Sequence, residues 1–318
     1  MSDNNDLLIL PNQGDSSNVL SPALSGLAAR GRKDASSLIS PKPNLDSLSA
    51  TEEAELNYSL GVLCYEGQRF PKDYQKAALL FRKAADEGHL RAQCSLGLMY
   101  DLGHGVPQNP KYAIEWYRRA AEQGSSNAQY YLGLHHEQGR GVPKNNALSA
   151  EWYRKAASQG HVGAQSRLGS LYYFGDGVQQ DYAEAVTWFR KAADQGDAVA
   201  QENLAVAYYR GEGVRQDRAL AGEWCRKAAV QGRASAQFLL GSQYKNGEGV
   251  PQDYGEAAVW IHKAAEQGLA AAQRFLGGLY HFGEGVRQDG KKAEYWFRKA
   301  AAQGDAGAES ILRSQYPD

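Results

Sequence analysis

The sequence predicts an all-α fold made of antiparallel helix pairs, and three observations support this prediction. Internal similarity returns at a constant interval of 36 residues, which is typical of repeat architectures. Each interval contains two stretches with apolar residues at helical spacing, bounded by glycine or by a helix-capping residue. The six tryptophans keep the same interval: Trp116, Trp152, Trp188, Trp224, Trp260 and Trp296.

The first helix of a unit carries one apolar face. In the second copy Ala92, Leu96, Met99 and Tyr100 lie at i, i+4, i+7 and i+8. Gly103 follows, and glycine most easily takes the left-handed conformation that ends a helix. We therefore expect the first helix to stop at this glycine.

The second helix begins behind an Asp or Asn side chain that can accept hydrogen bonds from the first turn. These capping residues are Asp73, Asn109, Asn145, Asp181, Asp217, Asp253 and Asp289. The helix is expected to end at a further glycine, namely Gly88, Gly124, Gly160, Gly196, Gly232, Gly268 or Gly304. The tryptophan of each second helix is predicted to be structural and to fill the space between neighbouring helices.

The glycine corner between the two helices could be read as a phosphate-binding loop, because closely spaced glycines let backbone N–H groups approach an anion. The corner, for example GEGVPQD, begins at Gly103, Gly139, Gly175, Gly211, Gly247 and Gly283, with a degenerate copy, GQRFPKD, at Gly67. A catalytic phosphate loop is needed once, so seven copies indicate a structural turn. The sequence predicts no cofactor.

Composition excludes several other classes of function. Thirty-five basic and thirty-six acidic side chains give a net charge of −1, which argues against nucleic-acid binding by bulk electrostatics. Basic doublets such as Arg118-Arg119 recur along the chain, and a glutamate lies four residues before one member, as Glu115 lies before Arg119. Ion pairs at this spacing neutralise the charge, so a solvated face is favoured over a nucleic-acid-binding surface. His135 and His136 point about 100° apart on a helix, which predicts packed or hydrogen-bonded histidines and no metal site.

Cysteine content and the amino terminus predict a cytoplasmic location. Three scattered cysteines are too few for a disulfide framework and fit a reducing compartment. The start MSDNND is acidic, and the apolar run that follows stops at Pro11, shorter than a signal core or a membrane span. We expect neither membrane insertion nor export through a cleaved signal.

The pattern A-Q-x-x-L-G-x-x-Y-x-x-G-x-G-V-x-Q-D-Y, followed by W-x-R-K-A-A-x-Q-G, resembles the Sel-one-like repeat (SLR), a 36-residue relative of the tetratricopeptide repeats. Seven units agree in register, at 56–91, 92–127, 128–163, 164–199, 200–235, 236–271 and 272–307, and a capping helix is expected at 308–316. The resemblance implies a right-handed α-solenoid, or superhelix, whose concave face holds a peptide or protein. A cysteine-rich secreted branch of the family is associated with penicillin binding and hydrolysis, but this chain lacks the paired cysteines of that branch.

The two ends of the chain depart from the repeat. The first unit has Arg69 and Phe70 in its corner and Leu80 at the tryptophan position, which suits an end unit. Residues 1–48 are rich in serine, asparagine and proline, which predicts a disordered leader before a solenoid over 49–318. Two apolar elements, 7–10 and 19–27, interrupt the leader and raise the possibility of intramolecular docking, with a plain solvated leader as the alternative. Ser49 and Glu52 resemble a capping box where order resumes.

Positions that vary between units are candidates for partner contact. The third and tenth positions of the first helix lie opposite its apolar stripe and are rich in aromatic residues. Tyrosine and arginine are favoured interface anchors because they combine a large area with a polar end. The predicted concave-face site consists of Tyr130, Tyr173, Tyr209, Phe238, Lys245, Arg274 and His281. The alternative is that these rings pack against the first helix of the neighbouring unit.

We therefore expect a non-enzymatic scaffold or adaptor for protein–protein interaction, without catalytic residues. The alternative from another class is a penicillin-interacting hydrolase or a small-molecule-binding repeat protein. The sequence contains no H-E-x-x-H, no nucleophile elbow and no intact Walker loop.

Overall fold

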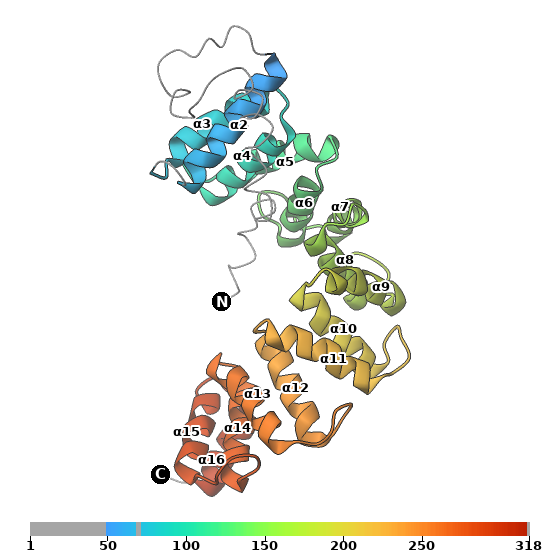
Figure 1. Cartoon of the computed structure of the whole chain (residues 1–318), viewed down its shortest axis with the longest axis vertical. Helices are drawn as coiled ribbons and strands as arrows, with labels where there is room; N and C mark the ends of the chain where they lie inside the picture. The colour runs from blue at the N-terminus through green and yellow to red at the C-terminus, as the bar shows by residue number, and fades with distance from the viewer. Residues whose placement is uncertain (1–48, 68–70, 317–318) are drawn as a thin grey trace, which may run out of the picture. The chain divides into compact units, whose positions relative to one another are not determined.

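A computed structural model describes residues 49–67 and 71–316 of the chain (Figure 1). This part contains fifteen α-helices and no strand, so the all-α prediction is confirmed. It forms two compact units, which we call the N-terminal block (described residues up to 161) and the C-terminal block (162–316). The predicted leader, 1–48, and the corner residues Arg69 and Phe70 lie outside the described residues.

The helices follow the predicted hairpin order in both blocks. The N-terminal block contains α2 (Ala50–Glu66), α3 (Tyr74–Asp86), α4 (Leu90–Leu102), α5 (Pro110–Glu122), α6 (Ser126–Gln138) and α7 (Asn146–Ser158). The C-terminal block contains α8 (Val162–Phe174), α9 (Tyr182–Asp194), α10 (Ala198–Arg210), α11 (Arg218–Val230), α12 (Ala234–Asn246), α13 (Tyr254–Glu266), α14 (Ala270–Phe282), α15 (Gly290–Ala301) and α16 (Ala306–Gln315). Consecutive helices within each block pack on one another, as α2 on α3 and α8 on α9 (Figure 1). The fold is an α-solenoid of 36-residue units, and its right-handed superhelix stays a prediction.

The helix ends confirm the predicted capping. All seven Asp and Asn residues accept hydrogen bonds from backbone N–H groups of the first turn, as Asp73 does from Lys76 at 2.9 Å. Ser49 and Glu52 form the expected capping box at the start of α2. The corner glycine Gly103 has a φ of 71° and ends α4.

The second glycine of each corner has a role beyond the turn itself. Gly105 also has a positive φ, and a Cβ there would lie 2.1 Å from the carbonyl oxygen of Tyr74 in the preceding unit. No side chain fits in that space. The corner of one unit therefore rests directly on the start of the previous unit's second helix.

The core of each unit depends on a close approach between its two helices. A Cβ on Gly97 of α4 would lie 2.7 Å from the ring of Tyr117, and one on Gly169 of α8 would lie 2.6 Å from the ring of Phe189. In the fifth unit the small residue is Ala205, and the ring is replaced by Cys225, which is fully buried in the same cluster. Alanine replaces glycine on the first helix, and the smaller cysteine replaces the ring on the second helix, so the space between them stays filled.

The tryptophans occupy a shallower layer than the residues that follow them. Trp188, Trp224, Trp260 and Trp296 are buried, whereas Trp116 and Trp152 are half-buried. The next residue, Tyr117, Tyr153, Phe189, Cys225, Ile261 or Phe297, is at most 2 % exposed. The tryptophans therefore share the space between helices with the residue that follows each of them, and that next residue makes the deeper contact.

Candidate partner-binding surface

The predicted site residues lie on the first helices, and the structure shows that their positions also join consecutive units. The third-position side chain of one unit meets the residue that precedes the next unit's first helix, 31 positions later. Tyr58 stacks on His89 with ring centres 4.6 Å apart, and Tyr130 stacks on His161 at 4.5 Å. In the C-terminal block three of the four pairs are polar: Ser166 donates to Asp197 at 3.0 Å, Glu202 binds Arg233 at 2.8 Å and Arg274 binds Asp305 at 3.0 Å. The fourth place is held by the apolar residues Phe238 and Leu269.

The tenth-position side chain meets the middle residue of the next glycine corner, 39 positions later. Tyr173 donates a hydrogen bond to Glu212, and Tyr209 donates one to Glu248. Lys245 forms an ion pair with Glu284 at 2.9 Å. Each pair links the end of one first helix to the corner of the following unit.

The seven predicted anchors are therefore half-buried side chains with neighbours inside the protein. Phe238 meets Phe275 edge to face at 5.0 Å, and His281 Nδ1 lies 2.7 Å from the Tyr316 hydroxyl. Six anchors lie in the C-terminal block, and Tyr130 lies in the N-terminal block. These are contacts of the kind that the packing alternative predicts, and each of the seven side chains also stays partly exposed.

Sequence analysis missed the acidic residues of the corners. Glu212, Glu248 and Glu284 stand at the variable place between the two glycines, where only the glycines were considered. The signal that could have found them is the constant 39-residue offset to a tenth-position Tyr or Lys. Phe174 and Phe282, each 68–69 % exposed, were also missed, and both end the first helix of their unit next to a predicted anchor.

The hydroxyls of the anchoring tyrosines are held protonated. Burial, together with the hydrogen bond to Glu212, raises the pKa of Tyr173. The hydrogen bond to Glu248 is the larger cause of the raised pKa of Tyr209. Both tyrosines are therefore neutral donors, which suits recognition and does not suit proton abstraction near neutral pH.

The basic doublets are used inside the repeat. Their first member reaches a tyrosine hydroxyl of the next unit, as Arg82 does with Tyr100 and Arg190 with Tyr208. Their second member lies over the tryptophan of its own helix: the distance from the cation to the ring centre is 4.6 Å for Arg119, 4.1 Å for Lys155, 4.0 Å for Lys191, 3.8 Å for Lys227 and 4.1 Å for Lys263. Cation–π contacts of this kind explain why the doublets recur with the tryptophans.

A buried polar cluster marks the N-terminal block. His135 Nε2 lies 2.8 Å from Asp101 Oδ2, and Tyr117 donates to the same oxygen at 3.0 Å. His135 Nδ1 lies 2.7 Å from the carbonyl oxygen of Arg140, so both ring nitrogens face an oxygen acceptor. The expectation of hydrogen-bonded histidines is confirmed for His135. Within residues 49–67 and 71–316 no group of three or more His, Cys, Asp or Glu side chains is placed to hold a metal ion.

Two of the three thiols, those of Cys94 and Cys225, are poor nucleophiles in this fold. Cys94 and Cys225 are buried, and burial raises the pKa of each to about 12. Since the thiolate is the reactive form, neither side chain is activated for covalent chemistry.

Comparison with protein families gives the same repeat boundaries to within a few residues. The model of the Sel1 repeat matches residues 54–89, 90–125, 126–161, 162–197, 198–232, 234–269 and 270–305. The chain belongs to the Sel1 repeat family. Sel1 repeat proteins are generally protein-interaction scaffolds and are typically non-catalytic.

Two solved Sel1 repeat structures are similar to this chain. One is a protective antigen of uropathogenic Escherichia coli strains with an SLR fold, with 37% sequence identity, a TM-score of 0.77 and coverage of 83% of this chain. This chain spans 57% of the length of that protein. The other is a Sel1 repeat protein from Oxalobacter formigenes, with 34% identity, a TM-score of 0.69 and coverage of 77% of this chain and 96% of the other. Among curated proteins none matches the chain.

Of the helices in the described ranges, none has both the length and the apolar character that crossing a membrane requires.

Proposed function

We propose that this Sel1 repeat protein is a non-enzymatic adaptor that binds a peptide or protein along the first helices of the C-terminal block, on the face predicted to be concave. The observation that carries the proposal is the row of half-exposed aromatic side chains, Tyr173, Tyr209 and Phe238, that contacts between units hold in place. Side chains already fixed lose little conformational entropy on binding, which favours affinity. The general role of Sel1 repeat proteins as interaction scaffolds supports the same conclusion.

The charges of this face favour a partner anchored by apolar and aromatic groups. Lys245 and Arg274 are paired with Glu284 and Asp305, so a partner's acidic group would have to displace an internal carboxylate. The exposed ring of Phe174 meets Tyr173 edge to face, with ring centres 5.0 Å apart, and widens the aromatic surface. We therefore assign Lys245, Arg274 and His281 a secondary, orienting role, and Tyr130 is a separate candidate in the N-terminal block.

Cross-linking pull-down with the wild-type chain beside a Tyr173→Ala plus Tyr209→Ala variant tests this proposal. Truncating one anchor at the centre of an interface costs about 2 kcal/mol or more, which is about thirtyfold, so the double variant should lose at least about thirtyfold in affinity for the captured partner. Tyr112→Ala plus Tyr295→Ala is the matched control, because these tyrosines are more than half exposed on second helices. Equal affinity of the double variant and the wild type, at unchanged melting temperature, would remove the two tyrosines from the site.

Two further expectations remain part of the proposal. The absence of enzyme activity is tested by β-lactam turnover on purified protein, in which hydrolysis above the buffer rate would favour the hydrolase alternative. A cytoplasmic location is tested by cell fractionation, in which recovery of the protein outside the cytoplasm would contradict it.

A further inference from the structure

The first repeat differs from the later repeats in how its apolar face is covered. Leu60 of α2 is half-buried, whereas its equivalents Leu96, Leu132, Leu168, Leu204, Leu240 and Leu276 are at most 1 % exposed. In later repeats the first helix packs on the second helix of the preceding unit, as α4 does on α3. In the described part of the chain no helix precedes α2, so this face has no such cover.

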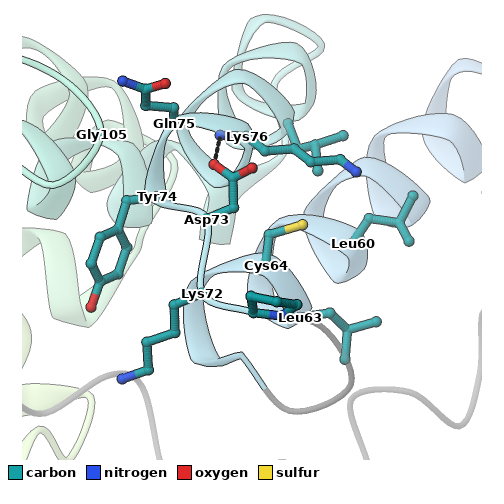
Figure 2. Close-up of a pocket in the computed structure, with 11 residues that line it drawn as sticks. Leu60, Leu63, Cys64, Lys72, Asp73, Tyr74, Gln75, Lys76 and Gly105 are labelled. Carbon is teal, nitrogen blue, oxygen red and sulfur yellow. Dashed lines mark hydrogen bonds between the residues drawn. The ribbon is translucent and has the colours of Figure 1, made fainter.

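A cleft of about 760 Å³ opens at this end unit, between α2 and the start of α3 (Figure 2). Leu60, Leu63 and Cys64 of α2 contribute one wall, and residues 71–76 with Leu80 contribute the other. The lining is predominantly apolar.

Two lining residues are smaller than their equivalents in other units, which accounts for the hollow. Cys64 stands where later units have the large rings of Tyr100, Tyr172, Tyr208, Tyr244 and Tyr280. Leu80 stands where they have tryptophan. An occupant that supplies aliphatic side chains would restore the apolar contacts that these rings make elsewhere.

We propose that leader residues 19–27 dock in this cleft through Leu24 and Leu27. These leucines lie at i and i+3 behind Ser21-Pro22, so a short helix beginning there presents both on one side. Insertion of an amphipathic helix into an apolar groove is a common mode of recognition, and the aliphatic stripe matches the aliphatic lining. This inference is independent of the proposed partner site, which lies in the other block.

The length of chain between this segment and α2 fits the distance to the cleft. Residues 28–48 form a tether that, as a flexible chain, spans roughly 25 Å. The cleft residues Leu60–Cys64 lie roughly 16–22 Å along α2 from Ser49, at 1.5 Å per residue. A tether whose length matches this distance gives residues 19–27 an effective concentration at the cleft on the order of 1 mM. The leader therefore outcompetes a second copy of the chain at micromolar concentration.

Cys64 provides a reporter for occupation of the cleft in the full-length protein. Cys64 lines the cleft and is 8 % exposed, and burial raises the pKa of its thiol. Cys94 and Cys225 are buried elsewhere, with pKa values raised to about 12. Maleimide labelling of each cysteine is followed by peptide mass spectrometry. If the segment binds on the order of 0.1 mM, Leu24→Ser plus Leu27→Ser should speed labelling of Cys64 about tenfold and leave the other two cysteines unchanged.

A matched control in the same leader is Leu8→Ser plus Leu10→Ser, which alters the other apolar element and should keep the wild-type rate. In a second measurement, Leu24→Cys should form a disulfide with Cys64 under mild oxidation, and Leu8→Cys should not. Equal labelling rates in the wild type and the Leu24/Leu27 variant would overturn the proposal. Faster labelling of Cys64 in the Leu8/Leu10 variant would also overturn it, because it would assign the cleft to residues 7–10. Faster labelling of the wild type on dilution would overturn it as well, because it would assign the cleft to a second copy of the chain.

Discussion

Asp101 of the N-terminal block and Tyr173 of the C-terminal block hold the same tenth position of a first helix and use it in different ways. In the second unit, in the N-terminal block, it is Asp101, which is 1 % exposed and receives hydrogen bonds from Tyr117 and His135. In the first and third units it is Tyr65, which meets His104 of the next corner, and Glu137, which accepts a hydrogen bond from Tyr153.

In the fourth, fifth and sixth units, in the C-terminal block, the tenth position is Tyr173, Tyr209 and Lys245, each half-exposed and paired with a glutamate of the next corner. In the seventh unit it is His281, which meets the Tyr316 hydroxyl. One position of the repeat thus joins neighbouring units either through a buried polar cluster or through an accessible pair.

This difference predicts a stabilising role for Asp101 and a recognition role for the accessible pairs of the proposed site. Removing one member of a buried charged cluster leaves its partners without water or a counter-charge, and this strongly lowers the free energy of unfolding. Separating an exposed pair costs little because water replaces the lost partner. The accessible pairs of the C-terminal block can therefore separate with little loss of stability.

The largest effect is expected for Asp101→Ala. This substitution leaves His135, Tyr117 and Arg140 facing a buried site without their acceptor, so we expect a loss of about 3–5 kcal/mol in the free energy of unfolding. Urea denaturation followed by circular dichroism measures the change. Asp101→Asn retains one acceptor oxygen and should cost less than Asp101→Ala. A loss below about 1 kcal/mol for Asp101→Ala would mean that the cluster contributes no more than an exposed pair.

The N-terminal block is also expected to carry an acid-sensitive histidine. Burial lowers the pKa of His161 to about 4 from its ordinary value of 6.5. The folded state disfavours the charged imidazolium, so the contribution of His161 is fully retained above pH 6.5 and lost as the pH falls to about 4. At 1.36 kcal/mol per unit this amounts to at most about 3 kcal/mol, and residual exposure of the ring reduces it.

Two substitutions test this contribution in pH-dependent urea denaturation. His161→Ser, which reproduces Ser125 of the preceding unit, should flatten the loss of stability between pH 6.5 and 4. Asn127→Glu should flatten it as well, because Asn127 holds the place from which Glu55 contacts His89 at 2.9 Å two units earlier. An unchanged pH profile in both variants would show that His161 does not cause the acid sensitivity.

The repeat itself was readable from the sequence, whereas the pairing between units was not. Glycines, capping residues and apolar spacing act within one unit, so their pattern predicted helices, corners and caps wherever the structure describes them. The contacts of Tyr173 with Glu212 and of Glu202 with Arg233 join residues of different units. Their offsets of 39 and 31 residues depend on how consecutive units stack, which local periodicity does not encode. The cleft at α2 was hidden for the same reason, since Cys64 is small only in relation to the tyrosines of other units.

A smaller effect is expected at the close contact that both blocks share. A Cβ on Gly133 would lie 2.4 Å from the ring of Tyr153, which is fully buried, so Gly133→Ala should cost about 1–3 kcal/mol through overpacking. In the C-terminal block Ala205 faces Cys225, and there Ala205→Gly should cost only about 1 kcal/mol through lost helix propensity. Thermal unfolding of the two variants gives the comparison. A stabilising Gly133→Ala would show that the ring of Tyr153 can shift without cost.

The smallest effect is expected for the accessible pair of Lys245 and Glu284, whose side chains are 29 % and 32 % exposed. A double-mutant cycle of Lys245→Ala and Glu284→Ala should give a coupling energy of about 0.2–1 kcal/mol, and 1 M salt should remove most of it. The same cycle for Asp101→Ala and His135→Ala should give a larger coupling that salt changes little, because water and ions do not reach that cluster. Equal coupling energies with equal salt dependence would abolish the distinction between the two blocks. A strong, salt-insensitive coupling between Lys245 and Glu284 would also argue that this corner cannot open for a partner.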